Sequence, residues 1–135
     1  MLAAATTAWT ACTALPTGRA DVGDVLFLTE SQPATLYMDA LYKGTVAADA
    51  AGCLRLATES AHTVVWPFGF ELRPRDGALV VIAPGGREIG RLGGSFTFRG
   101  GEIPTLYEGI ALSDPQRAAA LERCPGRYWI VGEVP

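Results

Sequence analysis

Short runs of alternating apolar and polar residues recur along most of this chain, and glycine and proline separate them. Alternation with a period of two predicts β-strands, because successive side chains of a strand point to opposite faces. In the run 52–56, Cys53 and Arg55 share one face, while Leu54 and Leu56 share the other. Strands are expected at 24–29, 40–47, 52–56, 63–66, 70–73, 78–83, 87–92, 95–99 and 128–134.

Turn and helix signals connect these runs. The dipeptide Asp76-Gly77 between two apolar runs predicts a tight hairpin, and the glycines of 84–86 predict a second one. Ser113, with Gln116 three residues later, forms a capping box ahead of a helix at 117–123. The dipeptide at 125–126, Pro-Gly, is expected to end that helix.

These elements favour an all-β domain with one short C-terminal helix. Short strands with glycines inside and between them suit a small closed or partly closed antiparallel barrel, OB-like, because a closed sheet must coil sharply. A β-sandwich is the alternative. We expect an apolar, signal- or anchor-like segment and linker at 1–20, followed by a single β domain at 21–135.

The start of the chain differs in composition from the rest. Residues 1–14 carry no charge and resemble the apolar core of an export signal. The small residues that lead to Cys12 resemble a bacterial lipoprotein processing site, which makes Cys12 a candidate for lipidation. The positively charged start of such signals is missing, and Trp9 stands where an aliphatic residue is usual, so a short packed helix or strand is the alternative. No apolar run reaches the roughly 18 residues that span a bilayer, and no transmembrane segment is expected.

Charge narrows the range of partners. The 135 residues carry a formal charge of −3, whereas nucleic-acid binding needs a clustered basic surface. Nucleic acid is therefore not an expected partner. The sequence contains no P-loop, H-E-x-x-H or G-x-S-x-G motif, and no cofactor or metal is expected.

The three cysteines are Cys12, Cys53 and Cys124. Their spacing is too wide for a zinc cluster or a redox pair, both of which place two cysteines close together in sequence. In an exported protein, lipidation of Cys12 and a disulfide between Cys53 and Cys124 leave no odd thiol. The alternative is that Cys53 and Cys124 are buried as small hydrophobic side chains.

One aromatic segment and one histidine are the candidates for binding or catalysis. Trp66, Phe68 and Phe70 flank Pro67, and exposed aromatic rings of this kind bind sugars, peptides or lipids. The alternative is that the rings fill the core. His62 is the single histidine, and a hydrolytic site needs a histidine base, but no catalytic motif surrounds it. No catalytic residue is therefore expected.

Two motifs give the chain a resemblance to a known group of proteins. They are Val-Trp-Pro at 65–67 and Cys-Pro-Gly-Arg-Tyr-Trp at 124–129. Over residues 44–134 the sequence resembles a family of small bacterial cell-envelope domains, many of which look like lipoproteins. This resemblance implies an exported β domain in which Cys53 pairs with Cys124, and it implies no catalytic or binding residues.

These observations favour an exported envelope protein that acts as a non-enzymatic binding or structural module. Its expected partner is another envelope component, and its expected location is the periplasm or the outer surface, with a lipid anchor at Cys12. The alternatives are a small-ligand or oligosaccharide binder that uses Trp66, Phe68 and Phe70, a hydrolase that uses His62, and a cytoplasmic location.

Overall fold

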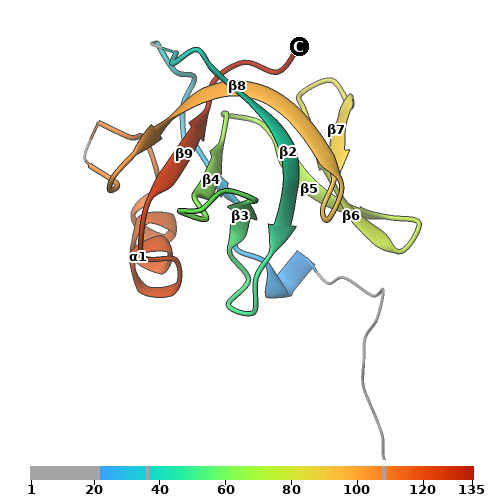
Figure 1. Cartoon of the computed structure of the whole chain (residues 1–135), viewed down its shortest axis with the longest axis horizontal. Coiled ribbons are helices and arrows are strands. Elements are labelled where there is room, and N and C mark those ends of the chain that lie inside the picture. Colours follow the sequence, from blue (N-terminus) through green and yellow to red (C-terminus); the bar gives the residue numbers. More distant parts are fainter. Residues whose placement is uncertain (1–21, 36, 108) are drawn as a thin grey trace, which may run out of the picture.

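Five strands close into a barrel in the computed structural model, which describes residues 22–35, 37–107 and 109–135 (Figure 1). Around the ring the order is β4-β3-β2-β8-β9, and pairing of β4 with β9 closes it. A small barrel with a C-terminal helix, predicted from the sequence, is thus confirmed. The strands are β2 (Ala40–Ala48), β3 (Leu54–Leu56), β4 (Thr63–Trp66), β8 (Ser95–Ile103) and β9 (Tyr128–Val131).

The barrel is mixed, whereas the sequence predicted antiparallel pairing throughout. Strands β4 and β9 run parallel, with Thr63 opposite Tyr128 and Val65 opposite Ile130, and the other four seams are antiparallel. A closed ring with an odd number of strands cannot alternate direction at every seam, so one seam must be parallel. The two-residue strand β1 (Leu28–Thr29) also pairs with β4 in parallel. It is shorter than the expected strand at 24–29, part of which forms the 3₁₀ turn η1 (Val22–Asp24).

A three-stranded antiparallel meander forms an additional sheet beside the barrel. It consists of β5 (Glu71–Arg75), β6 (Ala78–Ile82) and β7 (Glu88–Arg91). The predicted hairpin between β5 and β6 is confirmed, because Arg75 pairs with Ala78 across Asp76 and Gly77, which both have positive φ. Figure 1 shows this sheet and the helix α1 (Asp114–Arg123) on opposite sides of the barrel.

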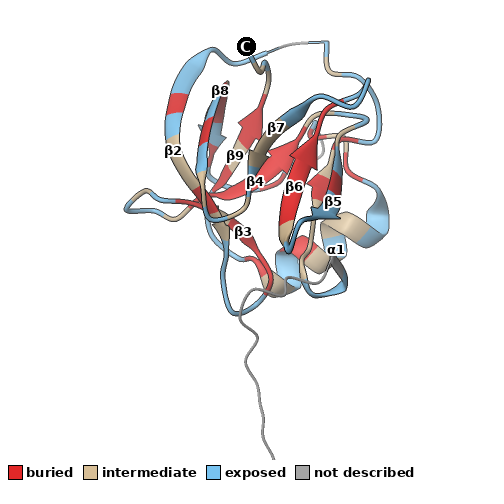
Figure 2. Cartoon of the chain, turned by 90° about the vertical axis from the view of Figure 1, so that its right-hand side faces the viewer, coloured by how far each residue is buried: buried red, intermediate tan, exposed pale blue. Residues whose placement is uncertain are grey.

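The main core lies inside the barrel and extends under the meander. Leu54 and Leu56 point into it, so Arg55 of β3, and Cys53 directly before the strand, face outward. Buried residues of β5 and β6 join the same cluster, and Figure 2 shows β4 and β6 coloured as buried. The cluster comprises Tyr42, Val46, Leu54, Leu56, Val64, Trp66, Leu72, Leu79, Val81, Phe96, Phe98 and Val131.

A second apolar cluster joins the outer wall of the barrel to α1. Val65 of β4 and Ile130 of β9 face it, together with Ala120 of the helix. The predicted N-cap is confirmed, since the Ser113 side chain accepts a hydrogen bond from the amide of Gln116 at 3.3 Å. Both faces of β4 are therefore covered, which explains why all four of its residues are buried. Among the described residues, no helix is long and apolar enough to cross a membrane.

Strand β8 pairs with β2 on one side and with β9 on the other, and both pairings include Gly100. Gly100 pairs with Ala40 of β2 on one side and with Val131 of β9 on the other. A Cβ atom at this position would lie 2.1 Å from the carbonyl oxygen of Ile130. Only glycine permits so close an approach of the two backbones, which the pairing of β8 with β9 requires.

Candidate functional site

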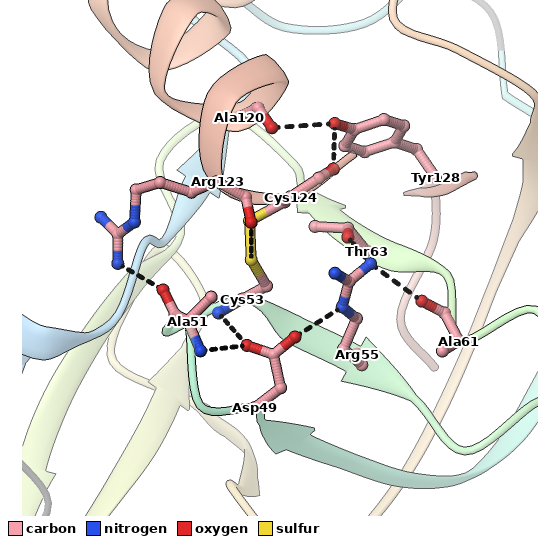
Figure 3. Close-up of polar contacts among 10 residues, drawn as sticks. All are labelled: Asp49, Ala51, Cys53, Arg55, Ala61, Thr63, Ala120, Arg123, Cys124 and Tyr128. Atoms are coloured by element: carbon pink, nitrogen blue, oxygen red, sulfur yellow. Dashed lines mark hydrogen bonds and ion pairs between the residues drawn. A yellow bond between two sulfur atoms is a disulfide. The ribbon is translucent and has the colours of Figure 1, made fainter. Parts of the chain in front are cut away.

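A disulfide ties strand β3 to the end of helix α1 (Figure 3). Cys53 and Cys124 are completely buried, and their Cα atoms lie 5.8 Å apart although 71 positions separate them in sequence. Cys53 stands on the outer face of the barrel, so its sulfur meets the C-cap residue of α1, which is Cys124. The pairing that the sequence predicted is confirmed.

Polar contacts fix both ends of this cross-link. The Tyr128 hydroxyl donates to the carbonyl oxygen of Cys124 at 2.5 Å, and it also lies 3.2 Å from the carbonyl oxygen of Ala120. On the other side of the disulfide, the guanidinium of Arg123 donates to the carbonyl oxygen of Ala51 at 2.7 Å. Figure 3 shows these contacts on either side of the sulfur atoms. The helix end and the β2–β3 turn are thus held together by hydrogen bonds as well as by the covalent bond.

Asp49 shapes the turn that presents Cys53. One carboxylate oxygen accepts hydrogen bonds from the amides of Ala51 and Cys53, at 2.9 and 3.0 Å, and the other accepts from Nε of Arg55 at 2.9 Å (Figure 3). Burial alone raises the pKa of Asp49, but the hydrogen bonds from Arg55 and the two amides outweigh it and hold the pKa below its ordinary value. Both oxygens serve the fold, so this network is structural.

His62 belongs to a second polar cluster, at the seam where β4 pairs with β9. Its Nε2 contacts the carboxylate of Glu102 on β8, and the same oxygen accepts a hydrogen bond from Nε of Arg127 at 2.7 Å. The Thr58 hydroxyl lies 2.8 Å from Nδ1 of His62. The rings of His62 and Trp129 pack nearly perpendicular to each other, with their centroids 6.0 Å apart. Segments that precede β4 and β9 are thus joined to β8.

Two interpretations of this cluster differ in their chemistry. Thr58, His62 and Glu102 follow the order hydroxyl, base and carboxylate, which is the order of a hydrolytic triad. Arg127, however, shares the carboxylate with His62: the hydrogen bond from Arg127, followed by that from His62, lowers the pKa of Glu102 to about 2. A carboxylate held by two donors from separate segments stabilises the seam, so we assign the cluster a structural role.

This assignment predicts an acid-dependent loss of stability. The pKa of Glu102 is about 2 in the folded chain, against an ordinary value of 4.5. Its ionised form therefore stabilises the folded chain fully above pH 4.5, and this stabilisation disappears as the pH falls toward 2. Glu102→Gln should therefore have a lower urea midpoint than the wild type at neutral pH. The difference between the two midpoints should shrink as the pH falls from 4.5 toward 2. The control is Glu122→Gln, an exposed charge on α1. A deficit that is independent of pH would contradict the assignment.

The aromatic segment at 66–70 does not form a common surface. Trp66 is completely buried, Phe70 is half-buried and stacks on it with ring centroids 6.3 Å apart, and Phe68 is exposed. Trp66 faces inward because it shares the barrel side of β4 with Val64, and Phe68 follows Pro67, after the strand has ended. A ligand-binding role for the three rings stays a prediction, for which Phe68 offers the accessible ring.

Sequence reasoning missed a cavity outside the barrel. It has a volume of about 580 Å³. Its described lining consists of Glu30, residues 32–35, Tyr37 and Met38 on one wall, Tyr107 and residues 109–111 on the other, and Ile130 of β9. Tyr37 and Tyr107 stand at its rim with 63% and 54% of their surfaces exposed, whereas Glu30 within it is only 8% exposed. The two walls lie outside the alternating runs, so no sequence period signals the cavity. An acidic residue directly after a strand, Glu30 after β1, was the single available hint.

The cavity is preformed by hydrogen bonds between its two walls. The amide of Ser31 donates to the carbonyl oxygen of Ala111 at 2.6 Å, and the hydroxyl of Ser31 lies 3.1 Å from the same oxygen. From α1, Arg117 donates to the carbonyl oxygen of Tyr107 at 3.1 Å and to that of Ile110. A volume of this size lies within the range of small-molecule sites.

Comparisons with known proteins do not add a candidate. No protein-family model matches the sequence, and the comparisons with curated proteins and with solved structures found no similar chain. Over the described part of the chain, no group of three or more His, Cys, Asp or Glu side chains is placed to hold a metal ion. Cys12, the candidate for lipidation, lies outside the described residues.

Proposed function

We propose that this chain is an exported domain of the bacterial cell envelope that acts as a non-enzymatic binding or structural module. The observation that carries the proposal is the buried disulfide between Cys53 and Cys124. Structural disulfides form and persist in oxidising compartments and are rare where cytosolic reductants act. The proposal therefore places the protein outside the cytoplasm.

Two features of the sequence support the same location. The uncharged, apolar start of the chain resembles an export signal, and the motifs around Trp66 and Cys124 resemble those of small envelope proteins. With two of the three cysteines cross-linked, Cys12 is left as the residue available for a lipid anchor. In this proposal the barrel is held at the membrane surface and presents its outer face to another envelope component.

Intact mass spectrometry of the protein from its native host tests the proposal. We expect the membrane fraction to contain a diacyl adduct on Cys12, and two cysteines that alkylate only after reduction, because Cys53 and Cys124 are paired. The matched variant Cys12→Ser should lose the adduct and the membrane association but keep the two reduction-dependent thiols. Recovery of an unprocessed soluble chain with three free thiols would overturn the proposal.

Hydrolysis is the second candidate function, favoured by the contacts among Thr58, His62 and Glu102. Those contacts supply a hydroxyl, a base and a carboxylate, but Arg127 competes with His62 for the same carboxylate oxygen. Assays of p-nitrophenyl acetate hydrolysis with the wild type and with His62→Ala distinguish the two roles. Hydrolysis that is lost in the variant would assign catalysis to the cluster.

A further inference from the structure

Glu30 lines the cavity with only 8% of the residue exposed, and its carboxylate has no polar partner among the described residues. Its amide continues the backbone pairing of β1 with β4 by donating to the carbonyl oxygen of Trp66 at 2.9 Å. No described donor lies within hydrogen-bonding distance of its side chain. Burial accordingly raises the pKa of Glu30. A carboxylate that is partly removed from water without a compensating hydrogen bond costs stability, and such groups are common at binding sites.

The described walls of the cavity supply no positive charge to balance Glu30. No Lys or Arg side chain of the described residues lines it. The nearest basic group of the adjoining helix, Arg117, donates to the backbone carbonyl oxygens of Tyr107 and Ile110. Within the described lining, Gln32, Thr35 and the tyrosines carry donors, but none of them bonds to the Glu30 carboxylate, and no side chain offers it a positive charge. An ammonium group supplies both the charge and the hydrogen bond.

The rim provides aromatic and thioether surface of the kind that binds organic cations. Tyr37 packs on Gly132, where an added Cβ would lie 3.3 Å from its ring, and Met38 packs on Gly101. Tyr107 folds over Gly109 on the opposite wall. These glycines let the side chains lie close to the backbone, so the rim is formed without a ligand. Tyrosine faces attract ammonium ions, and the attraction increases when water is excluded.

We propose that this cavity binds a small organic ammonium ion, whose amino group donates to the Glu30 carboxylate while its carbon skeleton lies against Tyr37 and Tyr107. This proposal names a ligand class for the binding role in the proposed function. It rests on the proposed function only for the location of the protein in the cell envelope. A primary ammonium fits best, because it brings the hydrogen-bond donors that the carboxylate lacks. A saccharide lacks the charge that Glu30 leaves unbalanced.

Two isosteric probes test the charge requirement. Pentylammonium chloride and 1-pentanol have nearly the same size, but only the first carries a charge. We expect titration with pentylammonium to shift the amide resonances of 30–38 and 107–111 in proton–nitrogen correlation spectra, and 1-pentanol to leave them unchanged. Equal binding of the two probes, or shifts that lie elsewhere on the protein, would overturn the proposal.

Variants separate recognition from folding. Glu30→Gln keeps the shape of the side chain but removes the charge, so it should weaken pentylammonium binding by about tenfold or more, the effect of losing a charge-assisted hydrogen bond. The same substitution should raise the melting temperature of the free protein, because it removes an unpaired charge that is partly shielded from water. Glu122→Gln, on the exposed face of α1, is the matched control and should change neither. Binding that survives Glu30→Gln unchanged would overturn the role of the carboxylate.

The aromatic rim has its own pair of variants. Tyr37→Phe retains the ring and should retain binding, whereas Tyr37→Leu should weaken it, since only the ring face attracts the cation. Binding of N-acetylglucosamine in place of the ammonium probe would instead identify a saccharide site and overturn the proposal. The binding test uses the purified folded chain, so a negative result would not contradict the export proposal. A negative mass-spectrometric result would likewise not contradict ammonium binding.

Discussion

Removal of the disulfide should cause one of the largest losses of stability available to a substitution in this chain. The bond joins residues 71 positions apart, and a loop of this length corresponds to about 4 kcal/mol of chain entropy removed from the unfolded state. We expect the double variant Cys53→Ala/Cys124→Ala to lose about 2–5 kcal/mol of unfolding free energy, measured by urea denaturation. Its urea dependence should also steepen, because the unfolded chain without the cross-link exposes more surface.

Reduction of the wild type separates the cross-link from the packing of the two sulfur atoms. A wild-type sample in dithiothreitol loses the bond but keeps both side chains, and it should fall to nearly the stability of the double variant. Dithiothreitol should not affect the variant itself. If reduction leaves the wild-type midpoint unchanged, the stabilisation comes from the hydrogen bonds of Tyr128 and Arg123 that frame the site, and the entropic account fails.

Local sequence signals were sufficient for most of the strands, for the helix and for grouping side chains by face, although only Leu28 and Thr29 of the strand expected at 24–29 form one. The alternation at 52–56 placed Leu54 and Leu56 together, and the structure shows both in the barrel core. The hairpin at Asp76-Gly77 and the helix cap at Ser113 depend on neighbouring residues, and both formed as predicted. These features need only the period of a strand or the hydrogen bonds of one turn.

Features that depend on closure of the barrel could not be predicted in this way. The parallel seam pairs Val64 with Trp129, and nothing near either residue specifies the other. His62 meets Glu102 across 40 positions, and the walls around Glu30 meet through Ser31 and Ala111, separated by 80. A pattern with a period of two identifies faces but not partners. The candidate sites arise where such distant segments meet, so each required the three-dimensional arrangement.

The burial of Trp66 provides the second large expected effect. Trp66 is 0% exposed and contacts four other rings, including those of Phe96 and Phe98, at centroid distances of 5.8 and 5.6 Å. Trp66→Ala removes the largest buried side chain of the barrel core and leaves a cavity that its neighbours cannot fill. We expect a loss of about 3–5 kcal/mol in unfolding free energy. Far-UV circular dichroism should follow the transition, because the substitution removes a fluorophore.

Two further variants show whether that loss arises from packing. Phe68→Ala alters the same aromatic segment at an exposed position, and it should cost less than about 1 kcal/mol because little buried contact is lost. Trp66→Phe retains an aromatic ring and removes the indole N–H, which has no hydrogen-bond partner among the described residues. It should therefore cost clearly less than Trp66→Ala. If Phe68→Ala proved as damaging as Trp66→Ala, the segment would be stabilised by surface contacts that the barrel core does not explain, and the distinction between a buried and an accessible ring would fail.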